Sequence, residues 1–245
     1  MTKQCNKERI KREIDHGKKI KEHAEDIWGW STKAGKKRAE RRANYFIKLG
    51  EFNDRSNILE IGCGTALFTE KVYKVTNANI TAIDISTDLL NKAKKKLPFI
   101  KFRQEDAMLM SFKDDFFDNV WGSSVLHHME VETVLKEIYR VLKPNGSIIF
   151  AEPNLINPQI FLQKNIPFIK RWMGDSPDEI AFVRWKIKRT IKKIGFKEIQ
   201  VFPYDFLHPA TPPVLVNVIN KLGLMCEKMP VIKEIAGSLI IYAKK

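Results

Sequence analysis

The sequence is poor in cysteine and has no apolar run long enough to cross a bilayer. Cys5, Cys63 and Cys226 are too few and too scattered for a disulfide framework, a zinc cluster or an iron–sulfur motif, so we expect a cytoplasmic protein without a metal site. The longest apolar stretches, near 156–169 and 214–225, are interrupted by Lys, Asn or Pro. The first residues are rich in Lys and Glu, so we expect no signal peptide.

Acidic residues are outnumbered by basic ones. The 43 Lys and Arg against 29 Asp and Glu give a formal net charge of +14. This excess suits an anionic partner such as nucleic acid, a phospholipid surface or an acidic substrate. It equally suits ordinary solvated helix faces, as in the lysine-rich run 92–96. The length of 245 residues, with 44% hydrophobic residues, is enough for one packed domain with appendages.

Alternating strand and helix patterns predict an α/β core in the middle of the chain. Alternation at this spacing is typical of a doubly wound, mainly parallel, Rossmann-like sheet with right-handed crossovers. The segment 143–146 predicts a turn that enters the fifth strand. The strands are expected near 57–61, 79–84, 100–103, 118–123 and 146–152, with helices near 67–75, 87–97 and 131–142.

The flanking regions follow different patterns. Residues 1–50 are expected to form an N-terminal helical cap, and residues 51–245 the main domain with substrate-shaping insertions at about 153–180 and 204–236. Two late strands without a crossover rhythm predict an antiparallel edge, which makes seven strands in all. The flanking helices are expected near 7–28, 36–49, 178–194 and 214–228, and the late strands near 197–203 and 238–243.

The most informative stretch is the apolar strand 57–61, which runs into a Gly-x-Gly turn. Gly62 and Gly64 let the backbone turn sharply and bring its N–H groups close to a ligand. Asp84 ends the next strand about twenty residues later, where its carboxylate can accept both hydroxyl hydrogens of a ribose. A nicotinamide dinucleotide site needs a third glycine where this chain has Leu67, so a dehydrogenase is disfavoured.

With its further motifs the chain resembles the class I S-adenosylmethionine-dependent methyltransferases, in the small-molecule branch with a short Gly-x-Gly-Thr motif. The resemblance covers about residues 55–152, in the family's order and spacing. One departure is Ala66, where many relatives have glycine. The motifs are Glu60-Ile-Gly-Cys-Gly-Thr65, Asp84-Ile85, Glu105-Asp106-Ala107, Phe117-Asp-Asn-Val-Trp-Gly-Ser-Ser-Val-Leu-His-His128 and Val141-Leu-Lys-Pro-Asn-Gly146.

The resemblance implies that the cofactor is S-adenosyl-L-methionine and the product S-adenosyl-L-homocysteine. It implies that Glu60 meets the cofactor's ammonium directly or through water, that Asp84 holds the ribose hydroxyls, and that Asp106 accepts from the adenine amino group. The other implied contacts are Gly62, Cys63 and Gly64 beneath the methionyl and ribose parts, Ile85 against the adenine, the Ala107 N–H to the adenine ring, and Ser123 beside the methionine portion.

The sequence says less about the methyl acceptor. A sulfonium methyl is already activated, so the enzyme orients the nucleophile and, for a hydroxyl or acidic carbon, removes a proton. His127 and His128 follow the fourth strand and are candidate catalytic bases, although either could serve only in packing; His208 is a weaker candidate. The fourth strand lacks the Asn/Asp-Pro-Pro-aromatic motif of enzymes that methylate amide or base nitrogens. This favours an oxygen or carbon acceptor, with other amines still open.

Aromatic and basic residues are interleaved in the cap and in the first insertion. They suit a small lipophilic or ring-containing substrate with an acidic group, or peripheral contact with an anionic membrane, and they equally suit a packed cap core. An RNA-modifying methyltransferase stays an alternative, although no RNA-binding module is visible and nucleic acid is not the expected partner. So does a catalytically silent cofactor-binding subunit. The expected substrate residues are Trp28, Trp30, Arg38 and Trp172.

Overall fold

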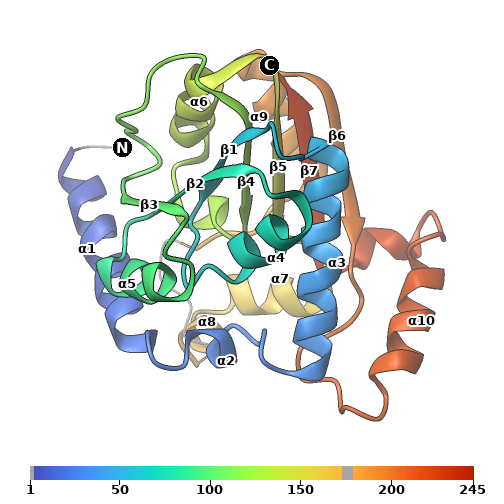
Figure 1. Ribbon diagram of the computed structural model, residues 1–245. Coiled ribbons are helices and arrows are strands. Elements are labelled where there is room, and N and C mark those ends of the chain that lie inside the picture. The colour runs from blue at the N-terminus through green and yellow to red at the C-terminus, as the bar shows by residue number, and fades with distance from the viewer. Residues whose placement is uncertain (1–2, 173–178) are drawn as a thin grey trace.

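A single seven-stranded sheet forms the centre of the computed structural model, which describes residues 3–172 and 179–245 (Figure 1). The strand order is β3-β2-β1-β4-β5-β7-β6. Strands β1 to β5 pair in parallel, and β7 lies antiparallel between β5 and β6, which confirms the expected fold class. The strands are β1 Asn57–Ile61, β2 Asn79–Asp84, β3 Lys101–Gln104, β4 Phe117–Ser123, β5 Leu142–Pro153, β6 Lys197–Tyr204 and β7 Ser238–Lys244.

Helices cover both faces of the sheet, and each face has its own apolar core. Helices α6 and α9 pack on one face, and α3, α4 and α5 pack on the other (Figure 1). Strands β1, β2 and β5 are buried on both faces over most of their length, as expected for the centre of a parallel sheet, whereas the edge strands β3 and β6 are more exposed. The helices are α1 Lys3–Ile20, α2 Ala24–Ile27, α3 Lys33–Gly50, α4 Leu67–Thr76, α5 Thr87–Lys96, α6 Val131–Val141, α7 Pro158–Asn165, α8 Pro167–Trp172, α9 Arg184–Ile194 and α10 Val216–Cys226, with short 3₁₀ turns at Leu126–His128 and Ile232–Ile235.

The local sequence explains why these elements form where they do. In α6 the buried residues Val134, Leu135, Ile138 and Val141 follow the helical period, so one face of the helix enters the core. Glu130 caps this helix by accepting from the N–H groups at 132 and 133.

Two segments differ from the sequence prediction, and the structure adds detail to a third. The single helix expected at 7–28 is divided into α1 and α2. The helix expected from 178 begins at Arg184, because Phe182 is extended and forms a bridge to Asn154. Helices α7 and α8 lie within the first expected insertion, for which no helix bounds were predicted. Pro158 and Pro167 stand at the first helical position, where a missing N–H costs nothing.

The N-terminal region contributes to the core and also covers the carboxyl ends of the strands. Phe46 of α3 packs against Trp121 of β4 at 5.1 Å between ring centroids, so α3 belongs to one helical layer of the sandwich. Helix α1 instead runs beside α5 (Figure 1). The division of the chain at residue 50 stays a prediction. In the described part of the chain, no helix combines the length and the apolarity that crossing a membrane requires.

Candidate active site

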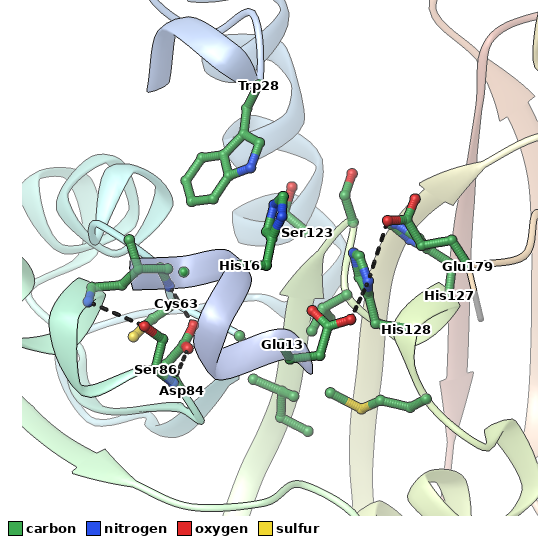
Figure 2. Close-up of a pocket in the computed structure, with 18 of the residues that line it drawn as sticks. Glu13, His16, Trp28, Cys63, Asp84, Ser86, Ser123, His127, His128 and Glu179 are labelled. Carbon is green, nitrogen blue, oxygen red and sulfur yellow. Dashed lines mark hydrogen bonds and ion pairs between the residues drawn. The ribbon is translucent and has the colours of Figure 1, made fainter. Parts of the chain in front are cut away.

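The carboxyl ends of the parallel strands open into a cavity of about 500 Å³ (Figure 2). It is bounded by α1, by residues 27–30, by α3 and by the turns after β1 to β4. The side chain of Trp172 lies outside the described residues. Of the other residues expected at the site, all but Glu60 and the weaker candidate base His208 line the cavity. They are Trp28, Trp30, Arg38, Gly62, Cys63, Gly64, Asp84, Ile85, Asp106, Ala107, Ser123, His127 and His128.

The glycine turn and the acid at the end of β2 form one hydrogen-bonded unit. Gly62 and Gly64 have φ of +67° and +52°, and a Cβ at Gly62 would lie 2.3 Å from Val125. The Asp84 carboxylate accepts from the Gly64 N–H and from the Ser86 N–H, both at 2.8 Å. A carboxylate has about four acceptor sites, so capacity remains for a ribose diol. The acceptor capacity of Asp84 beside this turn therefore fits the ribose hydroxyls of S-adenosylmethionine.

Ala66, which replaces the glycine of many relatives, adopts the conformation that glycine favours. Its φ is +62°, and its side chain is fully buried at the start of α4. A non-glycine residue in this left-handed region carries roughly 1–2 kcal/mol of backbone strain. The buried environment tolerates the methyl group, so the turn keeps its shape despite the departure.

Glu60 does not line the cavity, and its expected contact with the cofactor's ammonium, direct or through water, stays a prediction. Its side chain is buried beside α4 and accepts a hydrogen bond from the Thr69 hydroxyl. Burial, reinforced by the nearby Asp84 charge, raises the pKa of Glu60 to about 8. Alternation along β1 explains the position, because neighbouring residues of a strand point to opposite faces and Ile61 is the one that lines the cavity.

Helix α1 forms one wall of the cavity and makes two polar contacts across it. The Arg9 guanidinium lies 3.3 Å from the Asp106 carboxylate, which was expected to meet the adenine amino group. Gly17 allows close approach, since a Cβ there would lie 2.4 Å from the Ser86 hydroxyl. Glu13 approaches His128 from the same helix (Figure 2). The sequence pattern of α1 gave its helicity but none of these contacts.

Arg42 is a buried cation surrounded by hydroxyl groups. Only 2% of its surface is exposed, and among the described residues it has no carboxylate partner. Its guanidinium donates to Tyr204, Ser123, Ser124 and Ser238 at distances between 2.8 and 3.2 Å. A hydroxyl oxygen that accepts a hydrogen bond from arginine directs its own O–H away from the guanidinium. This cluster therefore combines a positive charge with several hydrogen-bond donors.

His127 is paired with a carboxylate that the sequence analysis did not single out. Its Nδ1 lies 2.8 Å from Glu152, which is fully buried at the end of β5. The other Glu152 oxygen accepts from the Val125 and Leu126 N–H groups, so the carboxylate is fixed. This contact sets the tautomer with Nδ1 protonated and Nε2 as the acceptor. Burial, together with His128, lowers the pKa of His127, so the ring is neutral near pH 7.

His128 is in a different electrostatic environment. Its Nδ1 lies 3.4 Å from Glu13 and 3.8 Å from Glu179 (Figure 2). Burial lowers the pKa of His128, but the two carboxylates outweigh burial and raise the pKa above its usual value. Of the two neighbouring histidines, His127 is therefore the one prepared to accept a proton.

The two histidines and Glu179 are grouped closely enough to resemble a set of metal ligands. One potential ligand atom from each lies within 4.8 Å of the others. However, Glu179 also accepts from the Lys164 ammonium at 2.7 Å, and Nδ1 of His127 is taken by Glu152. An ammonium at this position disfavours a second cation, so the cluster fits an ion-pair network better than a metal centre.

Sequence reasoning missed the polar partners that complete the site. The sequence analysis singled out neither Arg42 nor Glu152. A usable signal existed for Glu152, because the ends of parallel strands β4 and β5 must be neighbours if the strands pair. No local signal linked Arg42 to Ser238, which lies 196 residues away in the chain.

Comparison with known proteins agrees with this geometry. Residues 59–150 match the family model described as "Methyltransferase domain". A methyltransferase-like protein of Schizosaccharomyces pombe is 28% identical over 173 residues, which cover 71% of this chain and 66% of that protein. A 2-methyl-6-phytyl-1,4-hydroquinone methyltransferase of Synechocystis is 35% identical over 172 residues, which cover 66% of this chain and 53% of that enzyme. The chain therefore spans less than two thirds of the length of either relative.

Solved structures show the same fold. The crystal structure of a SAM-dependent methyltransferase from Archaeoglobus fulgidus has a TM-score of 0.61 and 20% identity, with coverage of 84% of this chain and 92% of that one. The fold, the glycine turn and the family match together define the class. Residues 59–150 form a methyltransferase domain of class I, the class that uses S-adenosyl-L-methionine as its cofactor.

Proposed function

We propose that the protein transfers the methyl group of S-adenosylmethionine to oxygen or carbon of a small, lipophilic or ring-containing metabolite. The His127–Glu152 pair carries the proposal. A neutral, carboxylate-oriented imidazole on the cavity wall is the group needed to remove a proton from a hydroxyl or acidic carbon. A substrate amine that is already neutral would need no such base.

The residues around the cavity divide the work of holding the cofactor. Asp84 and the glycine turn are suited to the ribose, and Ile85, Asp106 and Ala107 to the adenine. Arg42 and its serine partners are suited to the methionyl carboxylate, because a buried guanidinium without an acid gains a counter-charge there. When bound, the cofactor supplies an electrophilic methyl group.

The nature of the acceptor is supported by the cavity wall and by the relatives. Ile20, Ile27, Trp28, Leu89 and Ile160 give the wall apolar and aromatic surface. The hydroquinone methyltransferase of Synechocystis acts, by its name, on a ring that carries a long lipid chain. A lipophilic acceptor of this kind resides in a bilayer, so peripheral contact with a membrane belongs to the proposal.

The test combines cofactor binding with a substrate panel. We expect S-adenosylhomocysteine to bind the purified protein in calorimetry, and Asp84→Ala to weaken that binding about tenfold or more, because the ribose loses a charged acceptor. The wild type is then incubated with radiolabelled S-adenosylmethionine and a panel of phenols, hydroquinones, primary amines and RNA. Transfer to amines or RNA alone would contradict an oxygen or carbon acceptor. Binding without any transfer would favour the silent subunit.

A further inference from the structure

Helix α10 carries a stripe of apolar side chains on its outer face. Leu215, at the helix N-cap, begins it, and Val218, Leu222, Met225 and Met229 continue at intervals of three and four residues. Between 45% and 58% of each side chain is exposed. From Leu215 to Met225 the interval is that of one helix face, so these four side chains form a continuous outer stripe, and Met229 follows in the turn just after the helix. We call these five residues the α10 stripe.

The stripe lies in the most exposed apolar part of the described chain. Nine of its twenty exposed large apolar residues fall within 214–235. Isolated apolar residues on a surface need no explanation, but a contiguous group usually marks an interaction site.

The outward direction of the stripe is fixed by contacts on the other side of the helix. Val216 is fully buried against Ala34 and Leu207, and Gly223 packs so closely that a Cβ would lie 3.0 Å from Phe206. Glu227, just after the helix, forms an ion pair with Arg41 of α3. The helix therefore has a packed inner face and cannot bury the stripe by simple rotation.

The charges beside the stripe are of one sign. Lys221 and Lys228 are exposed, and Lys233 is partly exposed, next to the apolar residues. The acids nearby are paired, Glu227 with Arg41 and Glu234 with Arg184. An apolar helix face bordered by lysines matches a surface that combines an apolar interior with negative charge.

We propose that the α10 stripe docks the protein onto an anionic lipid bilayer, with Lys221, Lys228 and Lys233 against the lipid headgroups. The apolar side chains enter the boundary between headgroups and acyl chains, and the helix lies in the plane of the surface. Docking would bring the cavity to a lipophilic acceptor in the bilayer. The docking proposal rests on the proposed function in this respect alone.

Other exposed apolar residues lie near this surface. Phe161 and Leu162 of α7 are half exposed, and the neighbouring Ile160 lines the cavity. The α7 N-cap Asn157 donates to the backbone at Ile235, so α7 adjoins the end of the 214–235 segment. Figure 1 shows α7 and α8 near the lower middle of the view and α10 at its right. A docked molecule would present its cavity close to the membrane.

The experiment measures co-sedimentation with vesicles of phosphatidylcholine, with and without phosphatidylglycerol. We expect binding to the anionic vesicles, weakened by salt and weak on phosphatidylcholine alone. The double variant Val218→Ser, Leu222→Ser should bind about tenfold more weakly, because two apolar side chains leave the acyl boundary. Leu109→Ser is the matched control. Leu109 is 79% exposed on the β3–β4 connection, and its loss should leave vesicle binding unchanged.

Thermal unfolding and S-adenosylhomocysteine binding are measured for every variant. Because the substituted side chains are exposed, both should match the wild type, so a change in vesicle binding cannot come from misfolding or from the cofactor site. The proposal fails if the wild type does not bind anionic vesicles, or if Leu109→Ser weakens vesicle binding as much as the double variant does. A dimer in sedimentation that only the double variant abolishes would assign the stripe to a second copy instead. If the wild type does not bind S-adenosylhomocysteine, this contradicts the proposed function and leaves the docking proposal intact.

Discussion

Two clusters of buried polar groups line the cavity, and they differ in how their charges are compensated. Around Arg42 a cation is surrounded by neutral hydroxyls, with no acid among the described partners. Around His127 and His128 the carboxylates of Glu152, Glu13 and Glu179 face imidazoles. A buried charge without a counter-charge costs free energy unless a ligand supplies one. The first cluster is therefore incomplete without an anion, whereas the second is already balanced to hold and accept protons.

The comparison also separates two roles that the sequence could not distinguish. A donor-rich cationic cluster can hold the cofactor but cannot remove a proton. The histidine cluster can do so only where the ring is neutral, and the pKa directions assign that state to His127. Binding and proton removal should therefore fail independently when each cluster is altered.

The largest effect is expected from His127. With an acceptor found in the panel, His127→Gln should lower kcat by roughly 10²–10⁴-fold, because a positioned base is lost, while S-adenosylhomocysteine affinity stays unchanged. The matched variant His128→Gln should retain most of the rate. Because the pKa of His127 lies below its usual 6.5, the acid limb of the wild-type kcat/KM profile should fall below pH 6.5. Equal rates in the two variants would contradict the assignment of the base.

Arg42 should give the next largest effect, in binding instead of turnover. Arg42→Gln is expected to weaken S-adenosylhomocysteine about 100-fold, the scale of one lost buried charge-assisted contact. It should leave 5′-methylthioadenosine, which lacks the amino-acid part, almost unaffected. Arg42→Lys should recover part of the affinity. If calorimetry showed the same loss for both ligands, Arg42 would be a structural residue and the contrast between the clusters would disappear.

Glu60 offers a smaller effect, on stability. Its folded-state pKa of about 8 lies above the usual 4.5, so the folded state favours the protonated acid. The resulting stabilisation is complete below pH 4.5 and is lost as pH rises through 8. Glu60→Gln keeps an acceptor for Thr69 and carries no charge. Urea unfolding at pH 6 should show it more stable than the wild type by about 2 kcal/mol, because the unfolded carboxyl is then mostly ionised while the folded one stays protonated, and the difference should vanish near pH 4. A gain of equal size at both pH values would exclude titration of Glu60 as its cause.

Much of the fold and the cofactor turn could be predicted because the signals are local. The alternation of strand and helix patterns along the chain located strands β1 to β5 to within a few residues, apart from the start of β5. There the expected turn at 143–146 is part of the strand, with Asn145 in the left-handed region. Gly62, Gly64 and Asp84 were found because turn geometry depends on residue type at fixed spacing. The bounds of α7 and α8 were not predicted, since the prolines that begin them can either end or start a helix.

By itself, the sequence determined the order of strands and helices along the chain, the glycine turn and the acid at the end of β2 that is expected to hold a ribose, because these depend on neighbouring residues. Only the tertiary structure decided which charges meet. Arg42 joins Ser238 across 196 positions, and Glu13 of α1 reaches His128. It also decided which face of α10 is covered, since Val216 and Val218 are chemically identical yet one is fully buried and the other 57% exposed. Periodicity reveals that a helix has an apolar face, but packing against distant segments determines which face reaches solvent.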